Sequence, residues 1–188
     1  TSVIDSVAGM LNVSSAITTT ATGTVGNLQL VSTGGDINIM ANIALTGTGS
    51  FTANAAGNIF LGGSNASNRT GANSINTSGG SVGLYSNSGG NTTVTPTANA
   101  GASIKIWNDS SINSNGGAIT LGSLGATGYA QGGSGRNQVG VYLLGNTTLR
   151  SAGGNISISG SGAYSDSWQE SGIEIDGGSL GASTLDAG

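Results

Sequence analysis

A ten-residue motif recurs four times in this chain, and it limits the possible folds more than any other feature. The motif reads aliphatic, any, Ser/Thr, any, Gly-Gly, any, aliphatic, any, aliphatic, and its copies span residues 30–39, 75–84, 112–121 and 149–158. A weaker copy lies at 51–61. The starts at 75, 112 and 149 are 37 residues apart, and the step from 30 to 75 is longer by 8. A fixed spacing of this kind is typical of a repeat protein.

Within each copy, apolar residues alternate with polar or small ones. Pairs such as Ile37/Ile39, Ile104/Ile106 and Ile156/Ile158 put two aliphatic side chains on one face of a strand. The Gly-Gly pair supplies a tight turn that a residue with a Cβ would resist. The chain is therefore predicted to consist of short strands separated by glycine turns.

Two all-β architectures fit this pattern, a sandwich and a parallel β-helix. The β-helix is favoured because every copy carries the same turn, whereas hairpins would alternate turn types. Stacked coils would align the aliphatic residues, and the Ser/Thr at the third motif position, as ladders. With coils of roughly 18 to 19 residues, each 37-residue unit would form about two coils. Nine or ten coils would then give a rod about 45 Å long.

The composition excludes several classes of protein. Of 188 residues 36 are glycine and only 6% are charged, and the net charge is -4 with a pI of about 4.2. Collagen would need glycine at every third position and abundant proline. A nucleic-acid-binding protein would need a basic surface, so no nucleic-acid partner is expected. No apolar run approaches the length of about 18 residues that a membrane span requires, so no membrane insertion is expected.

The domain organisation follows from the extent of the repeats. Residues 1–188 are predicted to form a single β-helix segment, less regular over 1–27 and repetitive over 28–188 with a period of about 37 residues. The chain starts without methionine and stops in mid-pattern, so a segment of a larger protein is expected.

Insertions between strands carry much of the unusual chemistry. They fall at 62–73, 85–93, 122–138 and 160–171, and such insertions usually project from one face of a solenoid, often its binding face. The candidates for ligand contact are aromatic and basic: Tyr85, Tyr129, Arg136, Tyr164 and Trp168. The alternative is that these loops only keep the coil edges soluble. Trp107 is expected to point outward or to pack into a turn.

Carboxylates gather near the end of the chain. Glu174 and Asp176 alternate with aliphatic residues and share an outward face, near Asp166 and Glu170. These four are weak candidates for a calcium site, and a solvated face is the alternative. Without histidine or cysteine there is no Ser-His-Asp triad and no usual zinc site. No catalytic residue, cofactor or enzymatic activity is therefore predicted.

The segment Gly140–Gly160, GVYLLGNTTLRSAGGNISISG, resembles the repeats of filamentous haemagglutinin-type exoproteins of bacterial two-partner secretion. The resemblance covers most of 28–188. It implies a right-handed β-helix that is secreted to the bacterial cell surface through an outer-membrane transporter. It also implies cell adhesion, either directly or as a shaft that holds an adhesive tip. Host-cell surfaces or glycans are the expected partners, and end-to-end or lateral assembly into filaments is a further expectation.

Three other functions compete with this adhesive or structural segment. The first alternative is a carbohydrate-binding module that uses the projecting loops. The second is a β-helix enzyme that degrades polysaccharides, which would need two carboxylates across a cleft. The third is a threonine-rich ice-binding protein. Ice binding requires threonines in a flat array with a fixed period, and the Thr-x-Thr pairs at Thr46/Thr48 and Thr93/Thr95 share no such period.

Overall fold

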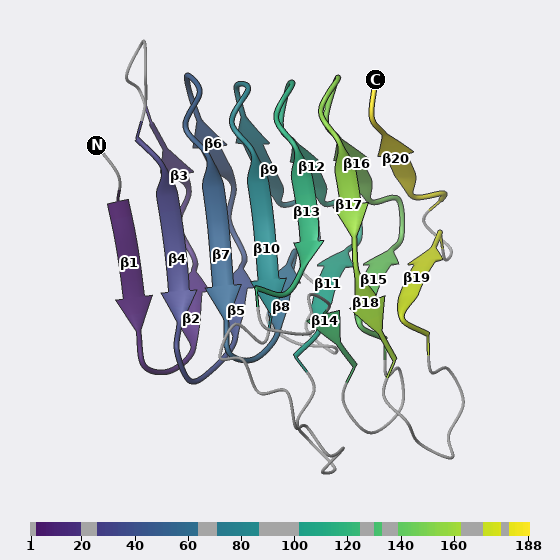
Figure 1. Cartoon of the computed structure of the whole chain (residues 1–188), viewed down its shortest axis with the longest axis horizontal. Helices are drawn as coiled ribbons and strands as arrows, with labels where there is room; N and C mark the ends of the chain where they lie inside the picture. The colour runs from purple at the N-terminus through teal and green to yellow at the C-terminus, as the bar shows by residue number, and fades with distance from the viewer. Residues whose placement is uncertain are drawn as a thin grey trace.

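The computed structural model describes residues 3–19, 26–63, 71–86, 102–124, 130–132, 139–162, 171–177 and 181–188. Over these residues the chain forms strands and turns and no helix. The strands build three parallel β-sheets of six strands each, and within each sheet the strands lie side by side in chain order (Figure 1). The predicted fold class, an all-β parallel β-helix, is confirmed.

The three long sheets are called A, B and C. Sheet A consists of β1 (Val3–Val7), β4 (Leu28–Ser32), β7 (Phe51–Ala55), β10 (Val82–Ser86), β13 (Ile119–Gly122) and β17 (Ile156–Ile158). Sheet B consists of β2 (Leu11–Val13), β5 (Ile37–Ile39), β8 (Ile59–Leu61), β11 (Ile104–Trp107), β15 (Val141–Leu144) and β19 (Ile173–Asp176). Sheet C consists of β3 (Ile17–Thr18), β6 (Ile43–Leu45), β9 (Ser74–Thr77), β12 (Ser111–Asn113), β16 (Thr148–Arg150) and β20 (Thr184–Asp186). A small sheet pairs β14 (Ala130–Gln131) with β18 (Gly160–Ser161).

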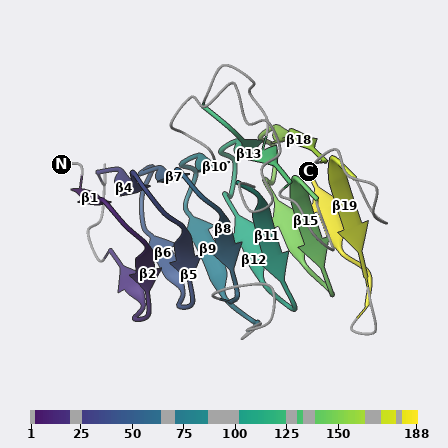
Figure 2. The same ribbon diagram turned by 90° about the horizontal axis from the view of Figure 1, so that it is seen from below.

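Each coil takes one strand from sheet A, one from B and one from C. In Figure 1 the chain descends the front along sheet A, climbs behind through B and C, and advances to the right with each coil, which makes the β-helix right-handed. Figure 2, seen from below, shows the coils as successive turns along one axis.

The number of coils differs from the prediction. Val82 pairs with Ile119, and Ile119 pairs with Ile156, so a step of 37 residues is one coil and not two. The described residues form six coils, with first and last strands about 24 Å apart at the usual strand spacing of about 4.8 Å. The estimates of nine or ten coils and of about 45 Å were wrong, because a coil of three strands joined by long connections uses more residues than a minimal one. Residues before Leu28, which match the motif less well, still form a complete coil.

The motif copies do not all occupy the same corner of the coil. Copies 75–84, 112–121 and 149–158 turn from sheet C to sheet A, whereas copy 30–39 turns from A to B. The first step between copies therefore includes a change of corner as well as the long connection at 62–73. The weaker copy at 51–61 stacks directly on the first, with Ile37 paired to Ile59.

The interior of the solenoid is a set of aliphatic columns. One column runs along sheet B through residues that are all fully buried: Ile37, Ile59, Ile104 and Val141. Each of these residues contacts its equivalents in the coils above and below. A hydrophobic content of 36% therefore suffices to fill a narrow core.

The serine/threonine ladder is confirmed at the corner between sheets C and A. Thr77, Ser114 and Ser151 are fully buried and occur one per coil. Thr77 Oγ1 lies 2.5 Å from the Gly80 carbonyl of its own turn and 3.2 Å from the Ser114 carbonyl of the next coil. Ser114 and Ser151 repeat this arrangement with Gly117 and Gly154. Each hydroxyl thus donates a hydrogen bond to a turn carbonyl that accepts none within the sheets.

The two glycines of each turn are required for different structural reasons. Gly79, Gly116 and Gly153, the first of each pair, have φ of +110°, +114° and +110°, a region that disfavours residues with a Cβ. The second glycine of the pair packs against the coil below. A Cβ on Gly117 would lie closer than 3.0 Å to backbone atoms of Gly80. The motif therefore combines a conformational requirement with a packing requirement.

Candidate functional site

Long connections gather at one corner of the solenoid. In the first three coils the connection from sheet A to sheet B covers only residues 8–10, 33–36 and 56–58. In the last three it covers residues 87–103, 123–140 and 159–172. Three of the four expected insertions therefore fall at the same corner, between sheets A and B, in consecutive coils. The fourth, at 62–73, lies at the corner between B and C.

The sheets stay in register across these changes in length. Ile59 and Ile104 pair although 45 residues separate them, and Ile104 and Val141 pair at 37. A long connection therefore shifts no strand in the coils on either side of it. The fold can hold segments of different length in a fixed order along one edge.

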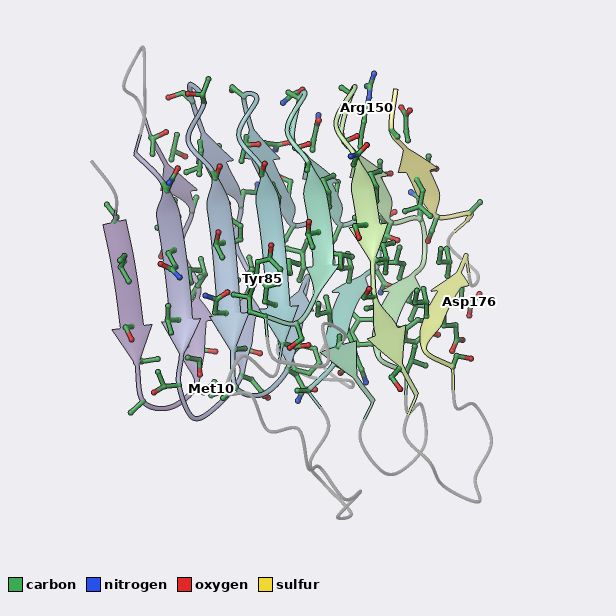
Figure 3. The ribbon with its side chains drawn as sticks, in the orientation of Figure 1. Met10, Tyr85, Arg150 and Asp176 are labelled. Carbon is green, nitrogen blue, oxygen red and sulfur yellow. The ribbon has the colours of Figure 1, made fainter. Side chains whose placement is uncertain are left out.

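Tyr85 lies on the outer face of sheet A (Figure 3). It is half-buried, and its ring lies over Gly83, two residues earlier in the same strand. A Cβ on Gly83 would come within 2.4 Å of the ring carbon Cε2 and 2.8 Å of the phenol oxygen. Gly83 therefore makes the room that lets the ring lie along the strand.

The surroundings of Tyr85 are small and uncharged. Its partners in the sheet are Asn54 on β7 and Gly122 on β13. Asn54 is 9% exposed, and its amide oxygen makes no hydrogen bond with any residue that the structure describes. The neighbouring outward row is also uncharged: Gln29, Thr52, Gly83, Thr120 and Ser157. The face around Tyr85 thus suits a neutral ligand better than a charged one.

Glu174 and Asp176 lie together on the outer face of β19, as predicted. Glu174 pairs with Tyr142 and Asp176 with Leu144 on the next strand. Burial, and secondly the Asp176 carboxylate, raise the pKa of Glu174 above its ordinary value. The calcium candidate requires Asp166 and Glu170 as well, so it stays a prediction. In the described part of the chain no three metal-ligating residues gather, while Asp166 and Glu170 lie outside it.

Trp107 packs instead of being exposed. It points out of the main core at the end of β11, yet only 1% of it is exposed, and its ring meets that of Tyr142 edge-on with centroids 5.6 Å apart. The Lys105 ammonium lies 5.9 Å from the Trp107 ring centroid. A second hydrophobic cluster therefore covers the outer face of sheet B: Phe60, Trp107, Val139, Tyr142 and Leu144.

This second cluster was missed from the sequence. A residue between two inward-facing aliphatic residues would be solvated if nothing covered the outer face of the sheet, yet Phe60 and Tyr142 are only 5% and 8% exposed. The available signal was that the residue between two aliphatic residues is aromatic in the third coil (Phe60) and in the fifth (Tyr142). Each of these coils is followed by a long connection from sheet A to sheet B. Large apolar side chains on an outer face indicate that something covers it.

Of the predicted site residues, the structure describes Tyr85, Glu174 and Asp176. Tyr85 lies on sheet A in the fourth coil, and Glu174 and Asp176 lie on sheet B in the sixth. The other candidates fall outside the described residues: Tyr129, Arg136, Tyr164 and Trp168. Their role in ligand contact stays a prediction.

No protein-family model matches the chain, and no curated protein or solved structure matches it. The likeness to filamentous haemagglutinin-type repeats thus rests on the motif, and secretion, surface location and adhesion stay predictions. In the part of the chain that the structure describes, no helix is long and apolar enough to cross a membrane.

Proposed function

We propose that this chain is a stiff segment of a secreted bacterial surface protein, which displays connecting loops along one edge for adhesion. The observation that carries the proposal is the stacking of long connections at the corner from sheet A to sheet B in three consecutive coils. Binding residues are often found on loops held by a rigid scaffold, because a scaffold can keep its geometry while the loops vary.

The scaffold part of the proposal follows from the energetics of stacking. Each coil contacts only its neighbours, so stability accumulates along the axis and further coils extend the structure without redesign. Only 6% of the residues are charged, and the outward-facing residues of the strands are mostly short and polar. Both features suit a stiff shaft that stays soluble. The chain has neither histidine nor cysteine, the usual base and a common nucleophile of covalent catalysis, so we propose a structural or binding role rather than an enzymatic one.

Replacing the long connections tests the display function. Residues 87–103, 123–140 and 159–172 would each be replaced by Thr-Gly-Gly-Asp, the sequence of 33–36 that makes the same turn in the second coil. The shortened chain is expected to keep its β-sheet circular dichroism and to lose binding to epithelial cells by at least about tenfold. Thr48→Ala, an exposed substitution at the corner between sheets C and A, is the control and should keep binding. Equal binding by the folded shortened chain would refute the display role.

A second candidate function, binding of a neutral glycan on sheet A, is favoured by the arrangement of Tyr85 over Gly83. An aromatic ring presented on a flat polar surface can stack on a sugar ring, and the unpaired amide oxygen of Asn54 lies on the adjacent strand. The absence of charge along the described outward rows of sheet A favours neutral over sulfated sugars.

Two substitutions test the glycan site on an array of neutral and sulfated oligosaccharides. Tyr85→Ala is expected to weaken binding by about tenfold or more, because it removes the stacking ring. Gly83→Ala should weaken binding to a similar extent although the tyrosine remains, since the new Cβ displaces the ring. Thr18→Ala, an exposed substitution in the first coil, should leave binding unchanged. Wild-type protein that binds none of the neutral oligosaccharides would rule this candidate out.

A further inference from the structure

One turn in the middle of the solenoid carries a chemically labile pair of residues. Asn115 is followed by Gly116, and no other asparagine of the chain precedes a glycine. Both residues are exposed in the turn from β12 to β13, at the corner between sheets C and A. Asparagine is a thermolabile residue, because the next backbone nitrogen can attack its side-chain amide. A following glycine offers the least steric resistance to this attack, since it carries no side chain.

The coil before this turn holds the group that would leave in the attack. The Asn115 side-chain nitrogen Nδ2 donates a hydrogen bond of 2.6 Å to the Thr77 carbonyl. One coil earlier, Ser78 makes the equivalent contact, with its Oγ 3.3 Å from the Leu45 carbonyl. One coil later the equivalent residue is Ala152, whose side chain has no donor. The Asn115 side chain therefore links two successive coils at this corner.

The coil after this turn holds the nucleophile. The Gly116 backbone N–H donates a hydrogen bond of 2.5 Å to the Ser151 carbonyl. To attack, this nitrogen must lose its proton and turn toward Asn115 Cγ, and the hydrogen bond to Ser151 opposes both changes. The leaving group and the nucleophile are thus each held by a different neighbouring coil. The reaction therefore requires a local opening of the stack.

We infer that Asn115 is a site of hydrolytic modification that the two neighbouring coils protect, and that its reaction leaves this corner permanently weaker. In the first step the Gly116 nitrogen gives its proton to solvent and bonds to Asn115 Cγ, while the side-chain nitrogen takes up a proton and leaves as ammonia. One water molecule then opens the resulting succinimide ring at either of its carbonyl carbons, which gives aspartate or isoaspartate. The inference is independent of the adhesive function proposed above.

The product weakens the corner because it cannot replace the lost hydrogen bond. An ionised carboxylate only accepts hydrogen bonds, so it would face the Thr77 carbonyl with no proton between the two oxygens. Isoaspartate in addition routes the main chain through the former side chain, which changes the geometry of a turn in which Asn115 has a φ of +50°. A corner that has opened and reacted is therefore expected to close less well than before.

The first test follows Asn115 in the whole chain by mass spectrometry, in buffer and in concentrated urea at the same mildly alkaline pH. Trypsin releases residues 106–136, a peptide that contains both Asn113 and Asn115. Asn115 is expected to lose its amide at least about tenfold faster in urea than in the folded chain, because the folded chain reacts only when the corner opens. Asn113, which precedes a serine, is the internal control and should react more slowly than Asn115 in urea. Equal rates for Asn115 in both conditions, or no reaction in urea, would overturn the inference.

The second test measures what the product does to stability. Asn115→Asp reproduces one product and is expected to unfold at a lower urea concentration than the wild type. Asn115→Ala is the matched control, because it removes the donor without adding a charge and because Ala152 has a φ of +52° at the equivalent position. At neutral pH the Asp variant should be less stable than the Ala variant. The difference should shrink near about pH 3, where a protonated carboxyl can donate to the Thr77 carbonyl. An Asp variant as stable as the wild type at neutral pH would contradict the weakening of the corner.

Discussion

Replacing Gly117 by alanine is expected to destabilise the chain by roughly 3 kcal/mol or more. The new Cβ would overlap the backbone of Gly80 in the previous coil, where no flexible side chain can move away. Gly80 has the same close contact with Gly49, so a shift of one turn is passed to the next coil. Gly117 itself does not have a positive φ, so the effect measures the packing between coils and not backbone strain.

The free energy of unfolding from urea denaturation measures this effect, and Gly9→Ala is the matched control. Gly9 also lies in a turn, but a Cβ there would meet nothing within 4 Å. A change of less than about 0.5 kcal/mol is expected for the control. Equal stability of the two variants would mean that the coils do not approach as closely at their corners as the structure indicates.

Replacing Trp107 by alanine is expected to cost about 3–5 kcal/mol of stability, the range for removing a large buried aromatic side chain. Among the described residues Trp107 is the largest fully buried side chain, and it holds the second hydrophobic cluster together through its edge-on contact with Tyr142. The near-ultraviolet circular dichroism of the aromatic residues should weaken as well. Trp107→Phe, which keeps most of the packing, should cost less.

Met10→Ala is the control for Trp107, because Met10 is an apolar residue of the turn between β1 and β2 that is 59% exposed (Figure 3). Its loss is expected to change the free energy of unfolding by less than about 0.5 kcal/mol. If Trp107→Ala were as stable as Met10→Ala, the outer face of sheet B would be solvated and Trp107 would be free to bind a ligand.

The local features of the fold could be predicted from the sequence because they depend on residues close in the chain. The alternation at Ile37/Ile39 defines which side chains face inward, and the Gly79-Gly80 pair defines where the chain turns. The ladder through Thr77, Ser114 and Ser151 follows once identical motifs stack. Each of these inferences requires only the period of a strand and the geometry of a glycine turn.

The number of coils could not be predicted, because the motif does not encode which corner it occupies. The same Ser/Thr-x-Gly-Gly turn joins sheet A to B at Ser32 and joins sheet C to A at Ser114. Period and motif together therefore fit either one coil or two per 37 residues. Only the pairing of strands far apart in sequence, such as Ile59 with Ile104, distinguishes the two.

The candidate site could be predicted only in part. Tyr85 stood out as an aromatic residue at the end of a strand, but the role of Gly83 in placing its ring depends on a contact that strand alternation does not reveal. The outward position of Glu174 and Asp176 followed directly from their alternation with Ile173 and Ile175. Strand alternation alone does not predict the burial of Phe60, because burial depends on what lies over the sheet; the only signal in the sequence was the aromatic character of Phe60 and Tyr142.

Disulfide formation between Asn113→Cys and Arg150→Cys tests the central claim, one coil of three strands per 37 residues, most directly. The chain has no cysteine of its own, and these two residues pair on adjacent strands of sheet C. A disulfide needs Cα atoms about 4.4–6.8 Å apart, which adjacent parallel strands provide. The account predicts a disulfide under mild oxidation in this pair, and none between Asn76→Cys and Arg150→Cys, which are two coils apart. Failure of the first pair to crosslink in the folded chain would contradict it.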